Sequence, residues 1–210
     1  MPTDTFFRLP EEKRERIMES AWAEITRVPY SDVSINRIVQ GADIPRGSFY
    51  QYFKDKEDLF LSAIDECRSR ILILCHDELE RTHGDPFAVM LRVYDAFFLP
   101  DGRPAPEFKR AFDVLWLNTK IDIVRLLMER DEDTVSPYER AKEWIDTSLL
   151  RRQDPDFVEG IVSLLLSALG GAVARTMERP EKREEIRNYL QCHVSIIQHG
   201  AAADREGGTT

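Results

Sequence analysis

The chain has 210 residues, and its 29 Lys and Arg against 38 Asp and Glu give a formal net charge of -9. With 42% hydrophobic and 32% charged residues, the composition excludes a disordered or fibrous protein and predicts a soluble globular one. The longest mostly apolar run, 161–174, is shorter than the roughly 20 residues that a bilayer crossing needs. The first residues lack a secretion signal, and three cysteines cannot all pair within one chain, so we expect a cytoplasmic protein with reduced thiols.

Apolar residues recur at spacings of three and four along nearly the whole chain, which predicts an all-α fold. The first helix is expected from Pro10 to near Pro29. A second, short helix covers about 34–41. A third helix of about two turns opens at Pro45, and its two phenylalanines, Phe49 and Phe53, are expected to point inward.

The fourth helix is expected to begin at Asp55, an N-cap residue that forms an approximate capping box with Asp58. It ends at the Gly-Asp-Pro break at 84–86. Further helices are predicted at about 86–98, 105–130, 137–150, 155–178 and 181–199. The small and polar tail 201–210 is expected to be disordered.

Residues 34–53 have the pattern of a helix, a tight turn and a second helix. The second of these helices leaves a cation, a bare backbone patch, a hydroxyl, a phenol and an amide outward: Arg46, Gly47, Ser48, Tyr50 and Gln51. Such groups bind phosphates and base edges in a major groove. Residues 27–56 carry five basic against three acidic side chains. The same composition also fits an ordinary surface helix, because a net charge of +2 does not distinguish a DNA-binding helix from any other exposed helix.

Three segments carry a family resemblance: the first helix LPEEKRERIMESAWAEI, the short helix SINRIVQ and the run RGSFYQYFKDKEDLF. Together they resemble the DNA-binding domain of the TetR family of bacterial transcriptional regulators, from about Leu9 to Phe60. The third segment is the most specific of the three. The resemblance covers about a quarter of the chain.

The resemblance implies a three-helix helix-turn-helix DNA-binding domain at 1–56 and a ligand-binding and dimerisation domain at 57–200. It implies that the residues in contact with DNA are Ser34, Arg46, Gly47, Ser48, Tyr50, Gln51 and Lys56. Two positions depart from the family pattern. Asp43 stands where the turn usually has Gly, and it tolerates a left-handed backbone less well than Gly does. Pro45 replaces a Ser or Thr, so that we expect one hydroxyl contact to phosphate to be missing.

The helix predicted at 155–178 has small residues on one face: Ser163, Ser167, Gly170, Gly171 and Ala174. The next helix offers an apolar stripe at matching periodicity, which includes Leu190, Val194 and Ile197. Two such helices from each of two chains would form a four-helix bundle about a two-fold axis, and the resemblance implies that homodimer. The alternative is that both stripes pack inside a monomer.

Aromatic residues recur between positions 87 and 150, and six of them are candidates for lining an effector pocket: Tyr94, Phe97, Phe98, Phe112, Trp116 and Trp144. Polar groups nearby, Arg92, Asn118 and Asp122, could converge on the same largely apolar small molecule. Aromatic stripes at helical spacing also form ordinary core. The histidines lack the spacing of metal ligands, so we expect neither a metal nor a cofactor.

These patterns predict a dimeric, ligand-responsive transcriptional regulator, with the fourth helix as the lever between its two regions. It would repress from a palindromic double-stranded DNA operator and leave that operator when it binds its effector. One alternative is a helical adaptor that binds protein through Tyr50, Tyr52 and Phe53. An enzyme is the other alternative, although no catalytic motif is present. For the regulator, we expect Tyr50→Ala or Lys56→Ala to weaken DNA binding at an unchanged melting temperature.

Overall fold

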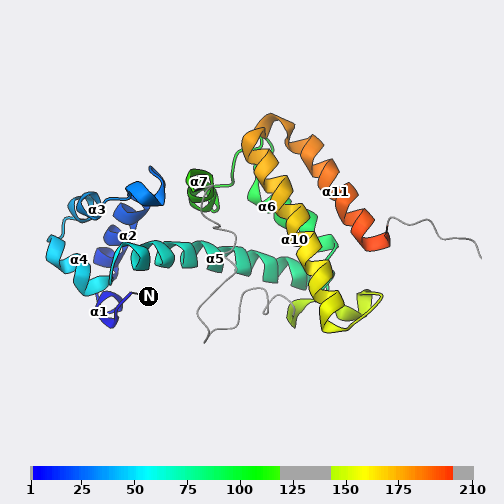
Figure 1. The fold of residues 1–210 in the computed structure, drawn as a ribbon, viewed down its shortest axis with the longest axis horizontal. Coiled ribbons are helices and arrows are strands. Elements are labelled where there is room, and N and C mark those ends of the chain that lie inside the picture. Colours follow the sequence, from blue (N-terminus) through cyan, green and yellow to red (C-terminus); the bar gives the residue numbers. More distant parts are fainter. Residues whose placement is uncertain (1, 119–142, 201–210) are drawn as a thin grey trace, which may run out of the picture. The chain divides into compact units, whose positions relative to one another are not determined.

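The computed structural model describes residues 2–118 and 143–200 of the chain. Within these ranges every element longer than three residues is an α-helix (Figure 1). The described residues form two compact units, which we call the head (2–73 and 106–118) and the body (74–105 and 143–200). The predicted domain boundary after residue 56 falls inside the head. The tail predicted to be disordered, 201–210, lies outside the described residues.

Four helices at the start of the head were predicted and one was not. The head contains α1 (Asp4–Phe7), α2 (Glu11–Ile25), the 3-10 helix η1 (Tyr30–Asp32), α3 (Ile35–Gly41), α4 (Arg46–Tyr52), the first part of α5 (Lys56–Arg81) and α7 (Lys109–Leu117). Helices α2 to α5 follow the predicted order and begin within one residue of the predicted starts. The four-residue helix α1 has no counterpart among the predicted elements.

The two short helices of the head depend on their neighbours for stability. Helices α3 and α4 have seven residues each, fewer than the roughly 12 that an isolated helix needs in water. Ile38 of α3 and Phe49 of α4 are fully buried, as is Phe53 directly after α4. The prediction that Phe49 and Phe53 point inward is therefore confirmed. At the start of α5, the Asp55 carboxylate accepts from the Asp58 backbone N–H at 2.8 Å, as the predicted cap requires.

Helix α7 is part of the head although it lies far along the chain. Its Ala111 and Val114 belong to the hydrophobic cluster that α2 to α5 form. The Arg110 guanidinium pairs with Glu19 of α2 at 2.6 Å and lies over the Trp22 ring. This packing could not be predicted, because the local sequence pattern of α7 does not indicate which helices it packs against.

The body is built from three helices and the end of α5. Its elements are α6 (Ala88–Phe97), the 3-10 helix η2 (Thr147–Leu149), α10 (Pro155–Glu178), the 3-10 helix η3 (Pro180–Lys182) and α11 (Arg183–His199). Helix α10 begins as predicted, because Asp154 accepts from the Phe157 N–H and Pro155 occupies the first turn. A helix was predicted as far as residue 150, but η2 forms there, because the Asp146 carboxylate binds the Ser148 N–H.

A buried polar network ties α6 to the other two body helices. The fully buried Tyr94 places its hydroxyl 2.7 Å from the Thr176 hydroxyl and 3.2 Å from the Arg183 carbonyl. The Asp95 carboxylate accepts from Arg183 at 2.9 Å and takes three further hydrogen bonds from Arg187. The hydrogen bond to Asp95 raises the pKa of the Arg187 guanidinium. Burial is the main cause that raises the pKa of the Tyr94 phenol.

Helix α10 is longer and more apolar than the run 161–174 alone indicated. It has 24 residues, and its most apolar window of 18 has a mean hydropathy of 1.9. By length and composition only, it is therefore the one helix among the described residues that could cross a membrane. We expected no such segment because we considered only the run 161–174 and not the whole helix that contains it. Within the body, α10 packs against both α6 and α11 (Figure 1).

Candidate nucleic-acid interface

The turn between α3 and α4 uses a left-handed residue. Asp43 has a φ of +50°, which is the conformation expected for this turn position. Its backbone N–H donates to the Gln40 carbonyl at 3.2 Å, and the Ile44 N–H donates to the Val39 carbonyl at 3.0 Å. Pro45 then precedes the first residue of α4 with an extended backbone. The turn thus has the predicted form, with Asp in place of Gly.

The outer face of α4 is open to solvent. Arg46, Gly47, Tyr50 and Gln51 are exposed, and Ser48 is half-buried. A Cβ built on Gly47 would meet nothing within 4 Å, so no neighbour within the described chain requires glycine there. A glycine in an exposed helix costs roughly 1 kcal/mol relative to alanine. The open space beside Gly47 lets another molecule approach the α4 backbone closely.

The N-terminal segment fixes the end of α4, which sequence reasoning missed. Thr3 donates to the Tyr52 carbonyl through its backbone N–H at 2.9 Å and to the Gln51 carbonyl through its hydroxyl at 2.7 Å. The buried Phe6 ring lies 5.0 Å from the Phe53 ring. Thr3 thereby occupies two of the carbonyl groups that the last turn of α4 would otherwise leave unpaired.

A buried carboxylate on α2 binds the backbone directly before α3. Glu24 is only 4% exposed, and one of its oxygens accepts from the Ser34 backbone N–H at 3.1 Å. The other oxygen takes two hydrogen bonds from Arg27, at 2.7 and 2.9 Å. The predicted N-cap, Ser34, makes no capping bond with its own side chain. A charged residue on the apolar face of α2 was the signal that could have revealed this contact.

Lys56 is engaged within the head. Its ammonium group donates to the carbonyl oxygens of Tyr30 and Ser31, at 3.0 and 3.2 Å, and lies over the Tyr30 ring. The Tyr30 N–H in turn donates to the Asn118 side chain at 2.8 Å. Burial, more than the nearby carboxylates of Glu57 and Asp55, raises the pKa of the Tyr30 phenol. Lys56 therefore holds the η1 turn in place in addition to any contact with phosphate.

This geometry changes the outcome expected for Lys56. We expect Lys56→Ala to lower the free energy of unfolding by about 1 to 3 kcal/mol, because the part-buried Tyr30 carbonyl and the exposed Ser31 carbonyl lose a charged donor. DNA affinity should fall with it. The neighbouring Lys54 is exposed, so Lys54→Ala is the matched control and should leave the urea midpoint unchanged. A Lys56→Ala protein with the wild-type midpoint would show that its contacts to Tyr30 and Ser31 contribute nothing to stability.

Two of the three residues proposed as the binding surface of a protein adaptor are buried. Tyr50 is exposed, but Tyr52 is 4% exposed and Phe53 is fully buried. Both rings pack around Phe6 in the head core. The three residues proposed for an adaptor surface do not form one patch, because Tyr52 and Phe53 form part of the core that supports α4.

The six residues predicted to line an effector pocket divide between the two units. Tyr94, Phe97 and Phe98 are buried in the body, and Trp144 of the body packs edge-on against His76. In the head, Phe112 is buried and Trp116 is 52% exposed. Of the predicted polar partners, Asn118 binds Tyr30 and Val114, Arg92 pairs with Glu78, and Asp122 lies outside the described residues.

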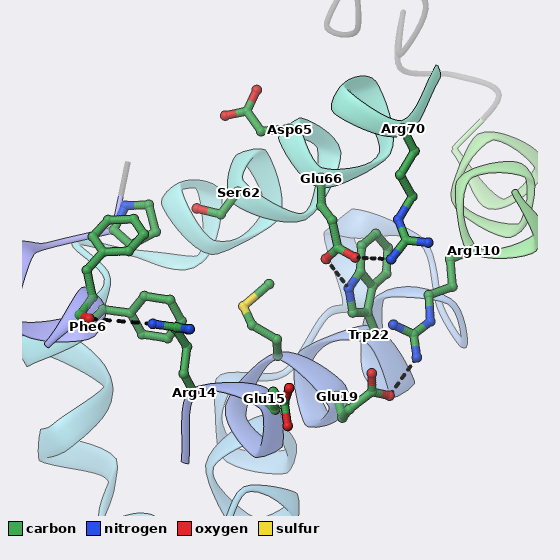
Figure 2. A pocket seen from close by; sticks show the side chains of 13 residues that line it. Phe6, Arg14, Glu15, Glu19, Trp22, Ser62, Asp65, Glu66, Arg70 and Arg110 are labelled. Atoms are coloured by element: carbon green, nitrogen blue, oxygen red, sulfur yellow. Dashed lines mark hydrogen bonds and ion pairs between the residues drawn. The ribbon is translucent and has the colours of Figure 1, made fainter. Parts of the chain in front are cut away.

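The head carries a surface pocket of about 540 Å³ between α1, α2 and α5, with Arg110 of α7 at its edge (Figure 2). Four of its charged groups are paired with one another. The Glu66 carboxylate accepts from the Trp22 indole at 3.0 Å and from Arg70 at 3.1 Å, and Arg110 pairs with Glu19 (Figure 2). None of the six predicted effector residues lines this pocket.

The predicted dimer residues of α10 and α11 lie in different environments. On α10 the small residues are all exposed: Ser163, Ser167, Gly170, Gly171 and Ala174. On α11, however, Leu190 and Val194 are buried against the rest of the body, and Ile197 is half-buried. The prediction chose the stripe that faces α10 of the same chain. The exposed apolar side chains of α11 are instead Tyr189, Cys192 and Ile196.

Comparison with known proteins agrees with a DNA-binding role for the head. Residues 17–63 match the family model of bacterial regulatory proteins of the tetR family. An uncharacterised HTH-type transcriptional regulator of Haemophilus influenzae is 24% identical over 94% of this chain and 95% of its own length. An HTH-type transcriptional repressor of Mycobacterium tuberculosis is 21% identical over 93% of this chain and 83% of its own length. A transcriptional regulator from Saccharomonospora viridis, solved in complex with choline, has the same fold, with a TM-score of 0.57 and 21% identity over 91% of this chain and 98% of its own.

Proposed function

Since the chain belongs to the TetR family of bacterial transcriptional regulators and binds DNA, we propose that it is a homodimeric repressor released from its operator by a small molecule. The observation that carries this proposal is the outer face of α4. Arg46, Tyr50 and Gln51 are exposed there on a helix whose inner face is fixed by Phe49. Gly47, with open space around it, allows a phosphate backbone to approach the helix closely.

The uncovered faces of α10 and α11 support the dimer. The face of α10 opposite its buried side carries no charged side chain between positions 160 and 174. Leu164 on this face is 56% exposed, and Tyr189 and Ile196 on α11 are 55% and 46% exposed. A second copy of the chain would bury these residues about a two-fold axis. Two heads separated by one turn of DNA, roughly 34 Å, would then read a palindromic operator.

The proposal of a small-molecule effector is supported by the Saccharomonospora viridis regulator, which was solved in complex with choline. Repression is supported by the relative from Mycobacterium tuberculosis, which is named a repressor. The effector would bind the DNA-free state of the dimer more tightly than the operator-bound state, and it would weaken operator binding by that difference in affinity.

Selection of DNA from a random library tests the proposed function. The full-length protein should enrich a sequence with two-fold symmetry, and binding to it should weaken steeply with salt, with a slope of about -0.9 for each phosphate contacted. Tyr50→Ala should reduce that affinity without lowering the melting temperature, because Tyr50 is exposed. Enrichment of no sequence at low salt would count decisively against DNA recognition by α4.

The three thiols should differ in reactivity. Burial raises the pKa of Cys67 to about 12 and that of Cys75 to about 11, whereas Cys192 is exposed. We therefore expect a maleimide at pH 8 to label Cys192 faster than Cys67 in the folded monomer, and dimerisation to slow the labelling of Cys192, which shares the exposed α11 face with Tyr189 and Ile196. The raised pKa values favour the folded state fully below pH 9. That contribution should disappear as pH rises toward 11 to 12, because the unfolded thiols ionise first. Labelling of Cys67 in the native protein would contradict its buried placement.

A further inference from the structure

A side chain of α3 holds the first residue of α4. The Arg46 guanidinium donates through Nη1 to the Asn36 side-chain oxygen. Both side chains are exposed, with Asn36 in the first turn of α3 and Arg46 at the start of α4. This hydrogen bond therefore links the two helices of the helix-turn-helix on its open surface, where a DNA groove would meet the protein.

The partner of Arg46 is neutral, and this is important for the chemistry of the guanidinium. Among the described residues no carboxylate forms an ion pair with Arg46. An amide oxygen fixes the orientation of the guanidinium but leaves its positive charge uncompensated. The guanidinium has five N–H donors, and the bond to Asn36 uses one of them. The remaining donors are sufficient for a bidentate contact with O6 and N7 of guanine.

A fixed guanidinium should discriminate bases better than a free one. An exposed arginine loses much rotamer freedom when it is held against a base edge, and a guanidinium oriented in advance loses less. The forked N–H donors of the guanidinium select a base only when the plane of the group is fixed, because a mobile guanidinium can turn toward the neighbouring phosphate. Asn36 supplies this orientation from a different helix.

We propose that Asn36 is a positioning residue that sets the base preference of Arg46. This inference deepens the proposed function and rests on it, because it requires that α4 reads DNA. Asn36 acts here through Arg46 and does not itself read a base. The base position concerned is the one at which Arg46→Ala loses discrimination.

A double-mutant cycle on the selected operator tests the proposal. Asn36→Ala should reduce discrimination at the Arg46 position by about tenfold, part of the effect of removing a bidentate contact. In the Arg46→Ala background, Asn36→Ala should cause no further loss at that position. Gln40→Ala removes an exposed amide from the same helix and is the matched control, which should keep wild-type discrimination.

Asn36→Asp separates positioning from direct reading. The aspartate keeps an acceptor for Arg46 but cannot donate to a base, so base preference at the Arg46 position should persist while overall affinity falls through the added negative charge. Additive losses in the cycle, or a loss in Asn36→Asp at a different base position, would overturn the proposal and assign Asn36 a base of its own. If operator binding is intact and Asn36→Ala discriminates normally, only this inference fails. If the wild-type protein selects no DNA, the proposed function fails as well.

Discussion

Replacing Phe6 with alanine is expected to lower the free energy of unfolding of the head by about 3 to 5 kcal/mol, in the range for a buried phenylalanine. Phe6 is 4% exposed and packs against the rings of Phe53 and Tyr52, with centroids 5.0 and 6.2 Å away. The substitution opens a cavity directly beneath the end of α4. Because α4 has only seven residues and depends on this packing, operator affinity should fall together with stability.

The adjacent Phe7 provides the matched control. It is 57% exposed, so Phe7→Ala removes a ring of the same size in the same helix at a cost of less than about 1 kcal/mol. Urea unfolding followed by the fluorescence of Trp22, which is buried in the head, measures both variants. Equal losses for Phe6 and Phe7 would mean that α1 does not pack as the structure shows, and that α4 is stabilised without it.

The helices that support the recognition face could be predicted because their apolar residues repeat at helical spacing. Phe49 and Phe53 were correctly placed inward by that spacing alone. Helix α1 was missed because four residues contain too little of a period to be recognised. The Glu24 carboxylate was missed for another reason. Its position on the apolar face of α2 indicates a buried charge, but residue types do not show that its partner is a backbone N–H ten residues later.

Helix α11 shows a second limit of periodicity. Its sequence contains two apolar stripes, one with Leu190 and Val194 and another with Tyr189 and Ile196. Periodicity identifies both as helix faces but does not say which one the same chain covers. Within the single chain, the first stripe, which was chosen for the interface, is buried and the second is exposed. Lys56 is a similar case, since a lysine at the start of a helix fits a phosphate contact and a structural contact equally well.

Gly170→Gln together with Gly171→Gln is expected to convert the proposed dimer to a monomer and to abolish tight operator binding. A Cβ at either glycine would meet nothing within 4 Å in the described chain, so both side chains fit a single copy. Gln also favours a helix interior over Gly by roughly 0.5 to 1 kcal/mol, so the monomer should be slightly more stable. In a two-fold interface each of the two overpacked positions occurs twice, so four added side chains at about 1 to 3 kcal/mol each should weaken association by about 4 to 12 kcal/mol.

Sedimentation equilibrium and operator titration measure the two consequences on the same samples. Ser195→Gln adds a side chain of the same size on the polar side of α11, where Ser195 is exposed, and should leave both association and DNA binding unchanged. The opposite signs expected for helix stability and for association distinguish a lost interface from a damaged fold. A doubly substituted protein that remains a dimer and binds its operator normally would show that the small-residue face of α10 lies outside the contact between the two copies.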